Sequence, residues 1–140
     1  MSKVAVQDRI RGALEGDPDV LVAYLFGSRT NGTASSLSDF DVAVLIDESC
    51  DLHTKHLELI DSIGAIVGSE RADVVILNDA PVTLAYKVLK ANTLLVSRDE
   101  KLRVDHWTKT VSRYLDMAPF RRILEAGLAN RLKEGRFGRL

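Results

Sequence analysis

The stretch that decides the fold runs from Gly27 to Asp41 and reads Gly27-Ser-Arg-Thr-Asn-Gly-Thr-Ala-Ser-Ser-Leu-Ser-Asp-Phe-Asp41. Apolar runs lie at 20–26 and 40–46, and each run predicts a buried strand. Since residues two apart on a strand point to the same face, Asp39 and Asp41 project together. Two carboxylates about 6 Å apart repel each other by about 3 kcal/mol at an effective dielectric constant of about 20. A divalent cation between them relieves this repulsion, and such oxygen ligands suit Mg²⁺.

The Gly27-Ser28 pair at the end of the first apolar run has the features of a phosphate-binding turn. Glycine permits a close backbone approach or a positive φ, and serine starts a helical turn well. Free N–H groups at such a turn attract phosphate. Either motif alone is typical of an ordinary turn or strand entry. Gly-Ser and Asp-x-Asp together, between two strands, indicate a nucleoside triphosphate with its Mg²⁺.

Helices and strands alternate along the chain. The spacing of apolar residues predicts helices at 3–15, 51–67 and 81–90, strands at 20–26, 40–46, 73–77 and 93–97, and a helical region from 99 to about 134 with a break near Pro119. This alternation predicts a small α/β (α+β) domain with a mixed sheet, its helices packed on the face away from the catalytic side. We expect a single domain over 1–140, with a core at 1–98 and a C-terminal helical extension at 99–140.

The segments Gly27–Gly32 and Ser38–Leu45 resemble the nucleotidyltransferase superfamily that includes DNA polymerase β. That superfamily carries Gly-Ser, a spacer, Asp-x-Asp and a third aspartate on a later strand, which Asp73 matches best. Over its whole length the chain is most similar to the short bacterial and archaeal subgroup, the minimal nucleotidyltransferases (MNT). The resemblance implies the polymerase β-like fold, with a small mixed sheet, helices on one face and helices at the C-terminus.

The resemblance also implies the residues of the site. Gly27, Ser28 and Arg29 would bind the nucleotide, which we expect to be ATP. Asp39 and Asp41 would bind two Mg²⁺ ions, and Asp73 would ligate one of them and help to deprotonate the attacking hydroxyl. In such two-metal transfer one ion lowers the pKa of the nucleophile and the other neutralises the leaving pyrophosphate.

The composition is ordinary for a soluble globular protein, at 46% hydrophobic and 28% charged residues. No segment has the length of a membrane span and no apolar leader opens the chain, so we expect no membrane association. The single cysteine, Cys50, excludes an internal disulfide and fits a reducing cytoplasm. Without a Cys pair the chain does not suggest zinc binding, and His53 and His56 are interpreted as helix-surface residues.

The formal net charge of −1 hides an asymmetry between the two ends of the chain. Residues 1–100 carry 9 basic and 16 acidic side chains, whereas residues 101–140 carry 10 basic and 4 acidic ones. The basic end is interpreted either as a surface for nucleic acid, nucleotide or an acidic partner, or as a solvated helix face. No interleaved aromatic residues support single-strand binding, so nucleic acid is not the expected substrate. Apolar residues from Phe120 to Leu132 recur at helical spacing, as core or as a partner contact.

The acceptor of the nucleotide is the open question. The chain lacks the further domains with which relatives grip a primer or an antibiotic, which leaves a protein acceptor as the leading hypothesis. The MNT subgroup resembles the antitoxin half of toxin–antitoxin pairs whose partner is a HEPN ribonuclease. The resemblance therefore implies transfer of AMP from ATP to a toxin tyrosine. The alternatives are a binding module that neutralises by occlusion, and transfer to a small molecule such as an aminoglycoside.

Overall fold

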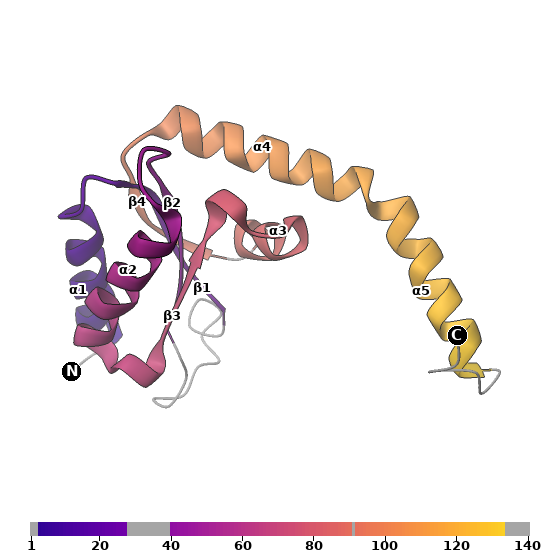
Figure 1. The fold of residues 1–140 in the computed structure, drawn as a ribbon, viewed down its shortest axis with the longest axis horizontal. Coiled ribbons are helices and arrows are strands. Elements are labelled where there is room, and N and C mark those ends of the chain that lie inside the picture. Colours follow the sequence, from indigo (N-terminus) through magenta and orange to yellow (C-terminus); the bar gives the residue numbers. More distant parts are fainter. Residues whose placement is uncertain (1–2, 28–39, 91, 134–140) are drawn as a thin grey trace.

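The computed structural model describes residues 3–27, 40–90 and 92–133 and contains a four-stranded mixed sheet (Figure 1). The strands are β1 (Val20–Phe26), β2 (Phe40–Ile46), β3 (Ala72–Ile76) and β4 (Asn92–Ser97), in the order β3-β2-β1-β4. β1 pairs antiparallel with both β2 and β4, whereas β2 and β3 are parallel. β1 and β2 have the long apolar runs of strands that are buried on both faces. The predicted mixed sheet is confirmed.

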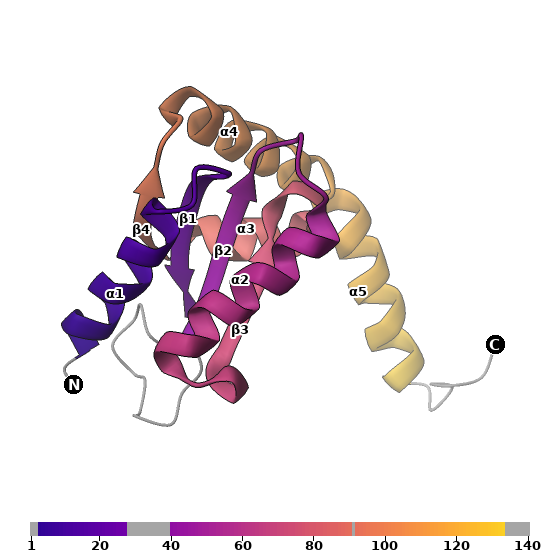
Figure 2. The ribbon, with the colours of Figure 1, turned by 60° about the vertical axis from the view of Figure 1, so that its left-hand side comes forward.

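Two helices cover one face of the sheet. α1 (Lys3–Glu15) and α2 (Leu52–Val67) lie in front of the strands in Figure 2. The larger part of the core forms here, because the even-numbered residues of β2 and β3 point toward these helices. The fully buried or nearly buried members of this core include Ile10, Leu14, Leu25, Val42, Val44, Ile46, Leu59, Ile63 and Val74.

The opposite face is covered as well. α3 (Val82–Lys90) places Ala85 and Val88 against Tyr24, Phe26 and Ala43 of the sheet. The start of α4 (Glu100–Asp116) packs Leu102 on the same cluster. The prediction that the helices lie only on the face away from the catalytic side is therefore wrong. The residues on this face of the sheet, Val22, Tyr24 and Phe26 of β1 and Ala43 and Leu45 of β2, are apolar, and α3 helps to bury them.

Several side chains fix the ends of the strands. The side-chain amide of Asn78 bonds both backbone groups of Ile46, accepting from its N–H at 2.9 Å and donating to its carbonyl at 2.8 Å. The Arg98 guanidinium donates to the carbonyls of Val20 and Glu15 at 3.1 and 2.7 Å. These bonds tie β3 to β2 and β4 to the chain that leads from α1 into β1.

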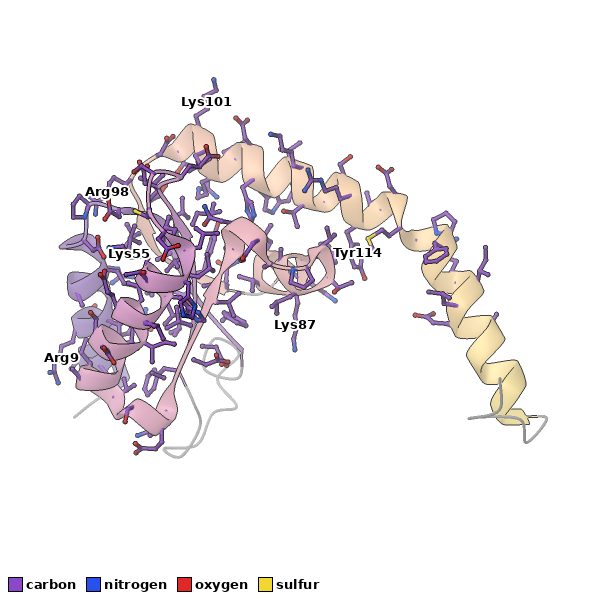
Figure 3. The ribbon with its side chains drawn as sticks, in the orientation of Figure 1. Arg9, Lys55, Lys87, Arg98, Lys101 and Tyr114 are labelled. Atoms are coloured by element: carbon purple, nitrogen blue, oxygen red, sulfur yellow. The ribbon has the colours of Figure 1, made fainter. Side chains whose placement is uncertain are left out.

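Lys55 on α2 is buried among three carboxylates (Figure 3). Its Nζ lies 3.0 Å from Asp17, 3.1 Å from Asp19 and 3.3 Å from Glu58. Burial alone would lower the pKa of Lys55, but the hydrogen bonds to these carboxylates outweigh it and raise the pKa above its ordinary value. The ammonium group therefore remains charged at neutral pH and joins α2 to the entry of β1.

The C-terminal helices form an arm. α4 runs past α3 and is followed, after a break at Met117, by α5 (Ala118–Lys133), which projects away from the sheet in both views (Figures 1 and 2). The break coincides with Pro119 in the first turn of α5, where proline is tolerated. No described helix is long and apolar enough to cross a membrane.

Candidate active site at the start of β2 and β3

Two carboxylates come together where β2 and β3 begin. Asp41 and Asp73 are register partners in the parallel ladder between these strands. Their neighbours Val42 and Val74 belong to the core under α1 and α2, so both aspartates point to the other face. Adjacent strands lie about 4.8 Å apart, which places the two carboxylates side by side. Asp41 is half-buried and Asp73 is exposed to solvent.

Gly27 provides the third described part of the site. It follows Phe26, which pairs with Asp41 across the antiparallel ladder of β1 and β2. Its φ is +84°, in the region that favours glycine, and a Cβ atom built there would overlap Oδ2 of Asp41. The Asp41 carboxylate therefore lies directly against the backbone of Gly27, a contact that only the absence of a side chain allows.

Three residues predicted for the site, Ser28, Arg29 and Asp39, lie outside the described residues. Within 3–27, 40–90 and 92–133, no three Asp, Glu, His or Cys side chains are grouped closely enough to hold a metal ion. The donors that are placed do fit Mg²⁺, because Asp41 and Asp73 offer carboxylate oxygens from two rigid, hydrogen-bonded strands. The arrangement as described is thus a pair of acidic ligands beside a close backbone turn.

The structure adds residues that the sequence did not single out. Asn92 pairs with Phe26 at the same end of the sheet, and its side-chain amide donates to the Val88 and Leu89 carbonyls at the end of α3. This bond anchors α3 beside the site. Figure 3 shows Lys87 pointing downward from α3, and its side chain is exposed. The sequence gives only a weak signal for both, since Asn92 reads as a turn residue and Lys87 as a basic residue in a last helical turn.

A cation also lies on the far face of the strand entry. The Arg71 guanidinium carbon is 5.3 Å from the centroid of the Phe40 ring. Arg71 precedes β3 and Phe40 opens β2, so the contact joins the two strands immediately before Asp41 and Asp73. It helps to hold the register on which the pairing of the two aspartates depends.

The two histidines of α2 have different surroundings. The ring Nε2 of His56 donates to the Val74 carbonyl at 2.7 Å, which fastens α2 to β3. His53 is exposed and lines a groove of about 740 Å³ between α2 and the chain that follows β3. This groove lies along the outer edge of β3, where Asp79 and Leu84 complete its lining.

Comparison with known proteins agrees with this geometry. The family model "Polymerase beta, Nucleotidyltransferase" matches residues 8–101, which include every predicted site residue. No curated protein matches the chain significantly.

Solved structures match nearly the whole chain. A complex of the tri-AMPylated Shewanella oneidensis HEPN toxin with MNT antitoxin matches with a TM-score of 0.72 at 23% identity, covering 91% of this chain and 99% of the other. A toxin–antitoxin structure with AMP-PNP matches with a TM-score of 0.74 at 26% identity, over 88% and 98% of the two chains. The toxin–antitoxin structure MntA–HepT matches with a TM-score of 0.71 at 23% identity, over 91% and 99%.

Proposed function

This chain belongs to the polymerase beta nucleotidyltransferase family, and from that premise we propose that it is an antitoxin that transfers AMP from ATP to a tyrosine of a HEPN toxin. The observation that carries the proposal is the register pair of Asp41 and Asp73 on one face, with the carboxylate of Asp41 packed against Gly27. A protein that only bound its partner would have no need for two adjacent acidic side chains at this place. The 26%-identical toxin–antitoxin structure with AMP-PNP supports an adenine nucleotide as the donor.

The proposed reaction is a single displacement at phosphorus. The tyrosine oxygen forms a bond with the α-phosphorus of ATP, the bond from that phosphorus to the bridging oxygen breaks, and pyrophosphate leaves. The hydroxyl proton goes to a base, a role that Asp73 fits because its exposed carboxylate can face the incoming acceptor. The toxin thereby gains AMP, which adds bulk and negative charge.

The remaining residues would hold the nucleotide. Asp41, fixed between Gly27 and Asp73, would share two Mg²⁺ ions with Asp73 and Asp39, and Gly27, Ser28 and Arg29 would bind the triphosphate. When bound, Mg²⁺ lowers the pKa of the attacking hydroxyl and neutralises the charge that develops on pyrophosphate. The close approach of the Gly27 backbone to the Asp41 carboxylate would keep the proposed phosphate turn next to the proposed metal ligands.

A HEPN toxin is the proposed acceptor because the matching structures include complexes with such a toxin, in one case tri-AMPylated. A tyrosine is the proposed target because its hydroxyl is a nucleophile of suitable chemistry, with an ordinary pKa of about 10 that a metal-activated site can lower.

The test is intact mass spectrometry of the HEPN protein encoded beside this chain, after incubation with ATP and Mg²⁺. Wild type should add one or more AMP units to a tyrosine. Asp73→Asn should reduce the rate by at least about 100-fold, since loss of a ligand and base removes several kcal/mol of transition-state stabilisation. Asp79→Asn is the matched control, because Asp79 is also exposed but follows the opposite end of β3.

Two results would contradict the proposal. Full neutralisation of the toxin by an Asp41→Asn/Asp73→Asn protein would assign the function to occlusion rather than to chemistry. Turnover of ATP with a small-molecule acceptor and no toxin present would assign the site to a different substrate.

A further inference from the structure

The exposed apolar side chains gather on the C-terminal arm. Among the described residues, eight large hydrophobic side chains are classed as exposed, and six of them lie on α4 and α5. These six are Val104, Trp107, Leu115, Phe120, Ile123 and Leu124, with exposed fractions between 45% and 68%. We call them the arm seam. An accumulation of this kind on one part of a surface marks an interaction site rather than chance exposure.

On α4 the seam has the spacing of a helix-packing stripe. Val104, Trp107 and Leu115 share a helix face with the half-buried Val111, at intervals of three, four and four residues. The face that packs on the body is a different one, formed by Leu102, His106 and Thr110. α4 therefore has two packing faces: the body of the protein covers one, and the apolar face with Val104, Trp107 and Leu115 is exposed.

On α5 the seam continues without cover. Ile123 and Leu124 follow Phe120 by three and four residues, and all three side chains are more than half exposed. Within the described residues, α4 is the only element with which α5 has more than marginal contact. The helix is held at its start, and the exposed apolar side chains that are described lie in its first half.

The seam fits one kind of occupant, a helical protein surface. A stripe of apolar side chains spaced three or four residues apart on a helix packs best into the grooves of another helix. We propose that the arm seam is the docking surface for the HEPN toxin, an inference that rests on the proposed function. In the solved toxin–antitoxin structures, one of which is a complex with a HEPN toxin, the match covers 97–99% of the solved chain and 88–91% of this chain. The matched region therefore extends into the arm.

The position of the arm suits the delivery of a protein substrate. α5 descends from the level of α3 to the level at which β2 and β3 begin, in two views that share the same vertical axis (Figures 1 and 2). A toxin bound along α5 would thus lie level with the end of the sheet that carries Asp41 and Asp73.

Charge points in the same direction. Residues 101–140 carry 10 basic and 4 acidic side chains, and exposed Arg122 adjoins Ile123 in the seam. Two copies of such an arm would repel each other, whereas a partner with acidic residues around an apolar helical face would be attracted. The chemistry therefore favours the toxin over self-association.

The experiment measures toxin affinity without nucleotide, in the Asp41→Asn background, so that catalysis plays no part. Leu124→Glu should weaken binding by at least about 30-fold, which is the size expected of a central apolar contact. Leu57→Glu is the matched control: Leu57 on α2 is 51% exposed, close to the 57% of Leu124, but lies outside the arm. It should leave the affinity within about threefold of the parent.

The outcomes separate the two proposals. Equal affinity of the Leu124→Glu and parent proteins would overturn the docking surface, whether or not AMP is transferred. Tight binding by wild type without any AMP transfer would overturn the proposed function and leave the docking surface standing.

Two further measurements complete the test. With Asp41 intact, Leu124→Glu should raise the KM for toxin and leave kcat at saturating toxin nearly unchanged. Gel filtration of wild type alone should give a monomer. A wild-type dimer that Leu124→Glu dissociates would show that the arm seam binds a second copy of this chain, and would overturn the docking surface for the toxin.

Discussion

At the scale of single residues, the site depends on a position where only glycine fits. Gly27 combines a φ of +84° with a neighbour, Asp41 Oδ2, that occupies the space of a Cβ atom. A side chain at position 27 would strain the backbone there and overlap the Asp41 carboxylate. Any side chain at 27 must therefore move either the turn or the proposed metal ligand.

Gly27→Ala should lower the free energy of unfolding by about 1–2 kcal/mol, because alanine resists the left-handed region. It should reduce AMP transfer by at least about tenfold, since the Asp41 carboxylate has to shift. Urea unfolding and the mass-spectrometric assay measure the two effects. Gly12→Ala is the control, because Gly12 lies inside α1 with open space around it. This substitution should stabilise the protein by about 0.5–1 kcal/mol.

At the scale of elements, most helices and strands could be predicted from the sequence to within a residue or two. β1 and β2 coincide with the predicted strands, because seven-residue apolar runs have few other stable environments. β3 begins one residue early, at Ala72, and ends at Ile76. Leu77 instead opens a 3-10 turn, at the point where Asn78 bonds the end of β2.

The arrangement of these elements could not be predicted in the same way. Periodicity tells which residues share a face, but it does not tell which strands are neighbours. The pairing of Asp41 with Asp73 needed the strand order, and the resemblance to a family supplied Asp73 where the pattern alone did not. The contact of Gly27 with Asp41 depends on backbone angles, which leave no trace in the sequence beyond the glycine itself.

The start of α4 carries a pH-sensitive contact. The Glu100 carboxylate accepts hydrogen bonds from the Arg103 guanidinium and, at 2.6 Å, from the Ser97 hydroxyl. These bonds, of which the one from Arg103 has the larger effect, lower the pKa of Glu100 to about 2. Because this value lies below the ordinary pKa of about 4.3, the contribution to stability is complete above about pH 4.3 and is lost as the pH falls toward 2.

Glu100→Gln should therefore lower the Tm at pH 6, and the difference from wild type should shrink between pH 4 and pH 2.5. Thermal unfolding at four pH values measures this. Glu125→Gln, at an exposed position on α5, gives the baseline for removing a carboxylate. A difference that stays constant with pH would show that the hydrogen bonds of Glu100 do not favour its charged form.

At the scale of the molecule, α5 is separate from the transferase body, and α4 connects the two. α1 and α2 contact each other and the sheet, and α3 packs on the other face of the sheet and against α4, whereas α5 contacts mainly α4. The body holds the proposed chemistry and the arm holds the exposed apolar residues. Each part should therefore be open to change with little effect on the other.

A chain that ends at Met117 should keep the body folded. We expect its free energy of unfolding to lie within about 1 kcal/mol of wild type, because the lost residues bury little surface. It should still bind ATP, as measured by calorimetry, and should modify the toxin far more slowly than wild type does. A large loss of stability would show that α5 supports the body.

The order of synthesis gives the strand topology a further meaning. β4 completes the sheet by pairing with β1, so the pairing of Val22 with Ser97 can form only after Ser97 has left the ribosome. Arg98 follows immediately and fastens the new strand to Val20 and Glu15. Pairing over such a distance along the chain is slow compared with the formation of local helices. A nascent chain would therefore complete its catalytic body only as α4 begins to emerge, and would gain the means of holding its partner last.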